Sequence, residues 1–348
     1  MQTPQENQPA RGPALVTGAA GFIGSRVVAR LLERGVTPVR CLTRPGSRTL
    51  GALADHPNVE VVTGNLLSRD DCDRIARGAA VVYHLAAGKG TKSYPDAFAN
   101  SVVTTRNLME ACGAAGTVRR FVNVSSFSVY SNVGNPRRRL LDESCPAEPR
   151  PARRDAYTYA KSKQDEMAVG MGRRFGIPVV IVRPGYVYGP GGGPAISGRV
   201  GLGGFGLFLH LGGGNPVPLT YVDNCADAIA LAGLAPGAEG EVFNIVDDHL
   251  PSSRRFLRLY KRHARRFRSL YLPHAASYLL VWAWESYSAR SEGQLPPVYN
   301  RALWHAFWKK TRYTNAKAKH LLGWEPLVPT EEGLRRWFAA CREELARA

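Results

Sequence analysis

The segment from residue 155 to 163 reads DAYTYAKSK and contains two tyrosine–lysine pairs that could do chemistry. Tyr157 precedes Lys161 by four residues, and Tyr159 precedes Lys163 by four. Residues four apart lie one turn apart on a helix, so either pair brings a phenol close to an ammonium group. A free tyrosine has a pKa of about 10, and a nearby positive charge favours the phenolate, which can exchange a proton with a substrate oxygen.

The helical arrangement predicts which pair faces inward. At about 100° per residue, Tyr157 and Lys161 fall on the apolar stripe of the helix. The other members of this stripe are Ala160, Gln164, Ala168, Met171 and Phe175. Tyr159 and Lys163 point nearly the opposite way, on a face shared with charged residues, which predicts contact with solvent. We therefore expect Tyr157 and Lys161 to be the reacting pair.

A glycine-rich turn near the start of the chain is the second chemical feature. The stretch ALVTGAAGFIGSRVVARLLERG predicts a short apolar strand, a turn containing Gly18, Gly21 and Gly24, and an amphipathic helix. Glycines let the backbone approach a pyrophosphate closely, and the amino terminus of a helix favours the phosphate charge. The sequence therefore predicts a dinucleotide-binding site.

The next expected strand, PVRCLTR, bears on which dinucleotide binds. About 20 residues after the last glycine, an NAD-binding fold usually has Asp or Glu for the ribose 2′-hydroxyl. This chain has Thr43 and Arg44 there, with Arg48 close behind. A guanidinium binds a 2′-phosphate that a carboxylate would repel, so we expect NADP in preference to NAD. If Arg44 instead points to solvent or stacks on adenine, the preference is weak.

Further expected strands, VEVVTGNLLS and AAVVYHLAA, alternate with helical segments. This alternation predicts an α/β fold with a doubly wound parallel Rossmann sheet and a ligand at the carboxyl ends of the strands. We expect the sheet domain over 12–185 and 219–246, a smaller, mostly helical substrate domain over 186–218 and 247–348, and a flexible tail over 1–11. The glycine-rich segment 199–215 is expected to be a mobile loop or lid. His84, alone at a strand end, is expected to be structural.

The composition is unlike that of a disordered or fibrous chain. The 348 residues are 44% hydrophobic and 21% charged, which is typical of a globular enzyme. Six separated cysteines without a Cys-x-x-Cys pair predict reduced, mostly buried thiols and no metal site. The polar first dozen residues, and the lack of an apolar run of about 20 residues, predict a cytoplasmic protein without a signal peptide or membrane span.

Two basic clusters stand out in a chain of formal charge +18, one around 137–154 and one at 254–268. As a helix, 254–268 would place a basic stripe opposite an apolar one. These stripes are Arg254, Arg258, Lys261, Arg265 and Arg268, and Phe256, Tyr260, Ala264, Phe267 and Tyr271. Such a helix can lie on an anionic membrane, although an ordinary solvated basic surface is the alternative. No recognition motif accompanies the charge, so we expect no nucleic-acid binding.

Several segments, in order, resemble the extended short-chain dehydrogenases/reductases, also called the NAD-dependent epimerase/dehydratase family. They are TGAAGFIGS (17–25), HLAA (84–87), NSVVTTRNLMEAC (100–112), VSSFSVY (124–130), the Tyr–Lys motif, RPGYVYGP (183–190), YVDNCADA (221–228) and TNAKAKHLLGWEP (314–326). The resemblance implies an enzyme that moves hydride between nicotinamide and a substrate carbon while Tyr157 exchanges a proton. Lys161 would hold the nicotinamide ribose. Ser126 would hydrogen-bond the reacting oxygen, with Ser125 and Ser128 close enough to confuse that assignment. A homodimer is also implied.

The resemblance implies the remaining site residues. Cofactor contacts are expected from Gly18, Gly21, Phe22, Ile23, Gly24, Thr43, Arg44, Arg48, Asn65, Leu66, Leu85, Ala86, Ala87, Tyr157, Lys161 and Pro184. Substrate contacts are expected from Lys89, Ser126, Tyr186 and Val187. Asn65 replaces the aspartate usual in the family near adenine, although its amide can still accept a hydrogen bond.

Substrate-side residues bear on the branch of the family. Nucleotide-sugar enzymes commonly carry Asn where this chain has Tyr186, and Arg-Asp where it reads PVPLT before the YVDN segment. RPGYVYGP and YVDNCADA look more like the 3β-hydroxysteroid dehydrogenase-like reductases of sterols, terpenoids and other apolar substrates. Two aromatic segments, YLPHAASYLLVWAWE and RALWHAFWKK, are expected either to line an apolar pocket or to pack on the sheet domain.

Three functions stay open from the sequence. The first is an NADP- or NAD-dependent oxidoreductase of a secondary alcohol or ketone with an apolar body. The second is a nucleotide-sugar epimerase or dehydratase with tightly bound NAD. The third is a catalytically silent cofactor-sensing protein, which the intact set of Tyr157, Lys161 and Ser126 argues against.

Overall fold

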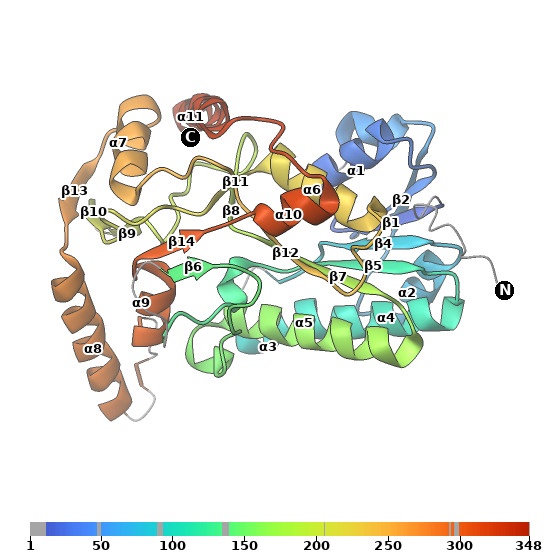
Figure 1. The fold of residues 1–348 in the computed structure, drawn as a ribbon, viewed down its shortest axis with the longest axis horizontal. Coiled ribbons are helices and arrows are strands. Elements are labelled where there is room, and N and C mark those ends of the chain that lie inside the picture. Colours follow the sequence, from blue (N-terminus) through green and yellow to red (C-terminus); the bar gives the residue numbers. More distant parts are fainter. Residues whose placement is uncertain are drawn as a thin grey trace.

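The structure is a computed structural model that describes residues 12–46, 50–88, 93–133, 139–204, 206–291, 294–295 and 299–347. The tail expected over 1–11, Arg48 and Lys89 lie outside the described residues. Seven parallel strands form the central sheet in the order β12-β7-β5-β4-β1-β2-β3 (Figure 1). Their bounds are β1 (Ala14–Thr17), β2 (Val39–Thr43), β3 (Val59–Thr63), β4 (Val81–His84), β5 (Arg120–Val124), β7 (Val179–Pro184) and β12 (Val242–Ile245). This order confirms the predicted doubly wound Rossmann sheet.

Helices cover both faces of the sheet (Figure 1). One face carries α1 (Gly24–Glu33), α6 (Val222–Leu234) and α10 (Ala316–Leu322), and the other carries α2 (Arg69–Ala76), α4 (Thr104–Ala115) and α5 (Ala156–Phe175). A further helix, α3 (Tyr94–Phe98), continues into α4 through a π-helical turn at Ala99–Val103. Strand β1, ALVT, is buried along its whole length, which explains its apolar character. Strand β5, RFVNV, is equally buried although it contains Arg120 and Asn123. All six cysteines are buried and unpaired, as predicted.

The second part of the molecule is built from small sheets and helices. Its strands are β8 (Tyr186–Tyr188), β9 (Gly201–Gly204), β10 (Leu207–His210), β11 (Leu219–Tyr221) and β13 (Arg268–Tyr271), and its helices are α7 (Ser253–His263), α8 (His274–Arg290), α9 (Arg301–Phe307) and α11 (Thr330–Arg347). Strand β6 (Arg139–Leu141) pairs with β14 (Thr311–Tyr313), so this small sheet joins two segments that are far apart in the sequence. Within the described residues, no helix is both long and apolar enough to cross a membrane.

The predicted structure of two segments in this part is wrong. The segment 199–215 is not a loop without regular structure, because it contains the β9–β10 hairpin, and β13 pairs with β10. Its role as a mobile lid stays a prediction. The segment 254–268 is not one helix, because α7 ends at His263 and β13 begins at Arg268. Long-range pairing with the hairpin takes the end of the segment out of the helix, an effect that helical periodicity cannot reveal.

The apolar face of α7 packs into a core with α11. Phe256 and Tyr260 on α7 lie 5.8 Å and 5.7 Å, between ring centroids, from Trp337 on α11. Trp337 is only 1% exposed. This face of α7 is therefore already occupied by protein.

We expect Trp337→Ala to lower the free energy of unfolding by about 3–5 kcal/mol, because it leaves a large cavity in this core. Chemical denaturation followed by circular dichroism measures the change. The matched control is Trp282→Ala on α8, where the side chain is 49% exposed and we expect little change in stability. Equal losses in the two variants would contradict the described packing.

Candidate active site

The structure places Lys161 inside the protein and brings Tyr157 next to Ser126. Lys161 is 5% exposed, and its Nζ donates to Val124 O at 2.7 Å and to Gln164 Oε1 at 2.9 Å. Tyr157 is half-buried and hydrogen-bonds with the Ser126 side chain. The predicted inward face of α5 therefore meets the carboxyl end of β5, where a reacting oxygen could contact both hydroxyls.

The other tyrosine–lysine pair lies on the outside of α5. Lys163 forms an ion pair of 2.6 Å with Glu166, and the two side chains are 41% and 62% exposed. Tyr159 differs from the prediction, because it is half-buried: its ring packs on Tyr94 and Phe98 of α3. Tyr159 therefore packs against α3 and Lys163 lies at the surface, so neither side chain points toward the strand ends.

Burial dominates the electrostatics of the reacting pair. It lowers the pKa of Lys161 from 10.5 to about 8, although the charge of Asp165 opposes this change. Burial also raises the pKa of Tyr157, and its hydrogen bond with Ser126 offsets part of the rise. The lowering of the Tyr157 pKa that we expected from a nearby ammonium is therefore not present in this arrangement, in which Lys161 is turned toward a backbone carbonyl.

The three serines after β5 have different surroundings. The Ser125 hydroxyl is buried and donates to Asp165 Oδ2 at 2.8 Å. Ser126 is half-buried beside Tyr157, and its Oγ accepts from the backbone N–H of Ser128 at 3.1 Å. The Ser128 side chain is buried. Of the three hydroxyls, that of Ser126 is in the position predicted for the third member of the catalytic set.

The glycine turn fits a dinucleotide pyrophosphate. Gly18 has a φ of +70°, and a Cβ there would lie 3.0 Å from Ala86 N. A Cβ on Gly24 would lie 2.1 Å from Gly18 O, so only glycine allows the helix to start this close to the turn. Ile23 caps α1 without a side-chain hydrogen bond, and the first turn holds no acidic residue. The N–H groups at this helix end can therefore receive a phosphate.

The expected adenosine end of the site lies after β2 and β3. Thr43 is half-buried at the end of β2, and Arg44 follows it with an exposed side chain. Asn65 is also exposed, but its Oδ1 accepts from Leu67 N at 3.0 Å and its backbone N–H donates to Asp71 Oδ2 at 2.8 Å. The Asn65 side-chain oxygen thus accepts a hydrogen bond within its own turn, which reduces its capacity to accept one from adenine.

The remaining described site residues lie at or just beyond the carboxyl ends of strands. For the cofactor these are Phe22, Leu66, Leu85, Ala86, Ala87 and Pro184. On the substrate side, Tyr186 and Val187 are half-buried in β8, and the Tyr186 hydroxyl donates to Ala195 O at 2.6 Å. Parallel strands end at one edge of the sheet, so the fold brings the predicted residues to a common edge.

The NAD dependent epimerase/dehydratase family has a sequence model that matches residues 14–246, which include all seven strands of the sheet. The chain belongs to this family. The family is named for NAD-dependent epimerases and dehydratases, and the relatives similar to this chain also include dehydrogenases.

Two relatives represent different activities. The trifunctional UDP-glucose 4,6-dehydratase/UDP-4-keto-6-deoxy-D-glucose 3,5-epimerase/UDP-4-keto-L-rhamnose-reductase RHM1 of Arabidopsis thaliana is 30% identical over 66% of this chain. The chain spans only 36% of the length of that relative. The 3-beta-hydroxysteroid dehydrogenase of Mycolicibacterium neoaurum is 28% identical, over 93% of this chain and 89% of the relative.

A solved structure shows the same fold. The UDP-glucuronic acid 4-epimerase from Bacillus cereus, in complex with NAD, matches with a TM-score of 0.72 and 22% identity. The match covers 97% of this chain and 98% of that one. The extended short-chain dehydrogenase/reductase fold therefore includes both parts of the molecule.

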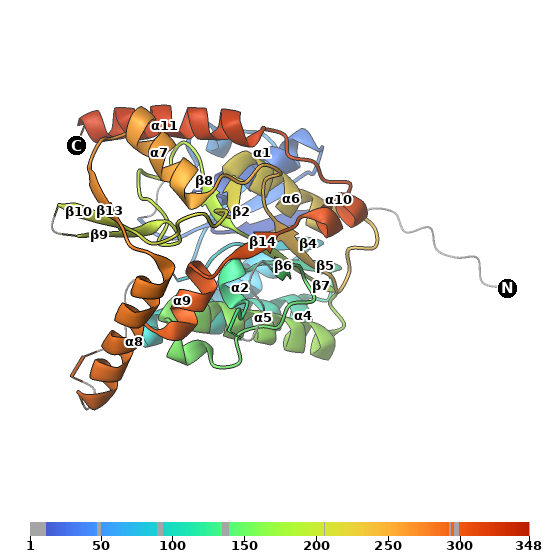
Figure 2. The same ribbon diagram turned by 60° about the vertical axis from the view of Figure 1, so that its left-hand side comes forward.

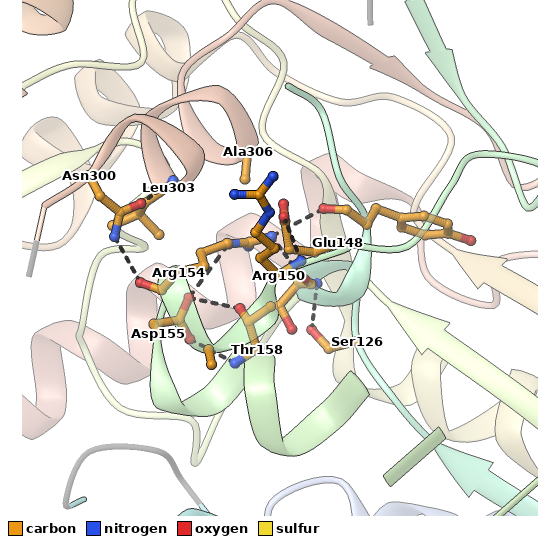
Figure 3. A network of polar contacts seen from close by, with 12 residues as sticks. Ser126, Glu148, Arg150, Arg154, Asp155, Thr158, Asn300, Leu303 and Ala306 are labelled. Carbon is orange, nitrogen blue, oxygen red and sulfur yellow. Dashed lines mark hydrogen bonds and ion pairs between the residues drawn. The ribbon is translucent and has the colours of Figure 1, made fainter. Parts of the chain in front are cut away.

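Arg154 is a site residue that the sequence did not single out. Its Nη1 donates to Ser128 O at 2.6 Å and to Tyr130 O at 3.1 Å, in the turn that follows Ser126 (Figure 3). Asn300 from the helical part donates to Arg154 O at 3.0 Å. Arg154 thus positions the Ser126 turn against the start of α5. In sequence it looked like one member of a basic cluster, and no local signal separated it from its neighbours.

His84 has the structural role that we predicted. Its two ring nitrogens lie 2.8 Å from the hydroxyls of Thr17 and Thr105, and burial lowers its pKa to about 3, with the charge of Lys161 acting in the same direction. The folded protein therefore keeps this imidazole neutral at pH values where the unfolded chain protonates it.

Between pH 6.5 and about 3, we expect His84 to make the free energy of unfolding fall by about 1.4 kcal/mol per pH unit as the pH drops. This contribution is fully present above pH 6.5, because both states are then neutral. Urea unfolding at a series of pH values should show a shallower slope for His84→Gln than for the wild type. The exposed His320→Gln is the control, and identical slopes for wild type and His84→Gln would refute the assignment.

Proposed function

We propose that the protein is a nicotinamide-dependent oxidoreductase of a secondary alcohol or ketone with an apolar body. The observation that carries this proposal is the meeting of Tyr157 and Ser126 over the buried Lys161, at the sheet edge that also holds the glycine turn. When bound, the nicotinamide exchanges a hydride with the substrate carbon. Tyr157 would exchange the proton of the substrate oxygen, Ser126 would hydrogen-bond that oxygen, and Lys161 would hold the nicotinamide ribose.

The molecule has an apolar pocket, although none of the residues that line it is a predicted site residue. A pocket of about 510 Å³ lies in the second part of the molecule. Its apolar lining includes Ile196, Leu202, Leu207, Phe208 and Phe267. Its size suits a small organic ligand. The similarity to a 3-beta-hydroxysteroid dehydrogenase along nearly the whole chain agrees with such a substrate.

A nucleotide-sugar epimerase or dehydratase is the second candidate. The similarity to the trifunctional plant enzyme and to the UDP-glucuronic acid 4-epimerase favours it. Tyr186, in place of the asparagine common in those enzymes, argues against it, because its hydroxyl is already bound to Ala195 O and cannot replace an amide. Such an enzyme would return the hydride within one catalytic cycle and keep its NAD.

We further propose that NADP is preferred to NAD. Arg44 is exposed directly after β2, where a 2′-phosphate would lie, and no carboxylate stands at that position. The family is NAD-dependent, so the preference would be a property of this chain.

We expect Arg44→Ala to weaken NADP binding about ten- to a hundredfold and to leave NAD binding unchanged, because it removes a charged hydrogen bond to the 2′-phosphate. Isothermal titration with both cofactors measures this, with Arg173→Ala on the exposed side of α5 as control. Mass spectrometry of the purified protein adds a second readout. Equal affinities in the wild type contradict the NADP preference, and copurifying NAD that does not exchange favours the nucleotide-sugar reaction.

We expect Tyr157→Phe to reduce turnover at least about a hundredfold, because no group then transfers the proton, while NADP binding is retained. The matched control Tyr159→Phe should keep its activity, because that ring packs on α3. The assay is nicotinamide absorbance with a panel of sterol and terpenoid alcohols and ketones, and with UDP-sugars in parallel. Loss of activity in Tyr159→Phe alone would reverse the assignment, and turnover of UDP-sugars alone would favour the second candidate.

A further inference from the structure

Helix α8 is rich in large apolar side chains, yet only one side of it is packed against the protein. Its buried residues are Ser277, Val281 and Ser288. Contacts with α9 hold this side: Trp304 Nε1 donates to Ser277 Oγ at 3.0 Å, and Arg301 pairs with Glu285 at 2.7 Å. The segment was expected either to line an apolar pocket or to pack on the sheet domain, and the structure instead packs α8 on α9.

The other side of α8 is an exposed apolar surface. Its large residues are between 37% and 61% exposed, and they are Leu279, Leu280, Trp282, Trp284 and Tyr287. At about 100° per residue they span an arc of about 200°, which holds no charged residue before Arg290 in the last turn. Figures 1 and 2 show that α8 projects away from the body of the molecule. A contiguous apolar surface of this kind normally marks a binding face.

The charge beside α8 indicates what binds there. The segment 254–268 carries eight arginines or lysines and no acidic residue, and β13 leads from it directly into α8. Arg262, Arg265, Arg266 and Arg268 are exposed. Figure 1 shows α7, β13 and α8 along the same end of the molecule. The apolar face of α7 is buried against α11, so the basic segment supplies charge but has no free apolar face of its own.

We propose that α8 is a membrane-docking element that inserts its exposed face into the headgroup region of an anionic lipid bilayer, next to the exposed arginines of residues 262–268. Tryptophan and tyrosine favour the membrane interface, because they combine a large apolar ring with one polar group. Arginines near the surface are attracted to anionic lipid. A symmetric dimer through α8 is a poorer solution, because a two-fold axis there would bring two basic segments together.

The exposed arginines beside α8 also border the apolar pocket. Arg265 and Arg268 line that pocket together with Leu207 and Phe208 of the hairpin. On the proposed function, an apolar substrate dissolved in the membrane would meet the pocket beside these arginines. Docking itself does not depend on turnover, so the two proposals can fail separately.

The test is flotation of the full-length protein with lipid vesicles. We expect the protein to float with vesicles of phosphatidylcholine and phosphatidylglycerol, and to remain unbound with phosphatidylcholine alone. The tryptophan emission should shift to the blue on binding, because Trp282 and Trp284 are exposed while the other four tryptophans are at most 6% exposed. Trp282→Phe combined with Trp284→Phe should abolish this shift.

Two sets of variants test separately the insertion of the apolar α8 side chains and the attraction of the arginines to anionic lipid. We expect Leu279→Ser, Leu280→Ser and Trp282→Ser together to abolish flotation. The control exchanges Val61, Leu321 and Leu327 for serine, because these apolar residues are also exposed but lie outside α8, and it should float like the wild type. Arg265→Glu, Arg266→Glu and Arg268→Glu together should weaken binding more than about tenfold, whereas Arg173→Glu with Arg174→Glu should not. Circular dichroism and NADP binding confirm that each variant is folded.

Three outcomes would overturn the proposal. The first is the absence of flotation of the wild type with anionic vesicles. The second is unchanged flotation of the triple-serine variant of α8. The third is a wild-type dimer, seen by analytical ultracentrifugation without lipid, that the triple-serine variant converts to a monomer, since the face would then bind a second copy of the chain.

Discussion

The buried ammonium group of Lys161 is the constraint around which the candidate active site is organised. A buried charge is costly unless its hydrogen bonds are satisfied, and here Val124 O and the Gln164 side chain accept them. Gln164 in turn donates to the Thr105 hydroxyl at 3.0 Å, and Thr105 contacts His84, which contacts Thr17. A single chain of hydrogen bonds therefore runs from α5 through α4 to β4 and to the strand that leads into the glycine turn.

A second buried charge braces the same region. The carboxylate of Asp165, one turn beyond Lys161, accepts from Asn123 and Ser125, each at 2.8 Å, and pairs with Arg183 at 3.1 Å. The Arg183 guanidinium also lies over the ring of Tyr130, 4.7 Å from its centroid. Because β5, β7 and α5 all contribute to this cluster, the helix that carries Tyr157 has little freedom to rotate relative to the sheet.

The apolar face of α7 is buried, whereas much of the apolar surface of α8 is exposed, and the spacing of their apolar residues explains the difference. On α7, Phe256 and Tyr260 recur one turn apart and form a single stripe, so one partner helix covers them. On α8, apolar residues occur all around the helix, and one neighbour can cover only part of it. The exposed basic residues between the two helices give that end of the molecule a positive charge.

The sequence by itself determined the parts that depend on local pattern. The parallel Rossmann sheet followed from alternating strands and helices, the glycine turn from its spacing, and the inward face of α5 from helical periodicity, which separated Lys161 from Lys163. Only the tertiary structure decided the parts that depend on distant partners. Pairing of β13 with β10 ends α7 early. The Arg154 side chain donates to a carbonyl in the turn after Ser126, which lies 26 residues earlier in the chain. Burial, rather than the neighbouring ammonium group, controls the pKa of Tyr157. Local periodicity records which face of an element is apolar, but the partner that covers that face, or leaves it open as on α8, is set by packing between segments far apart in the chain.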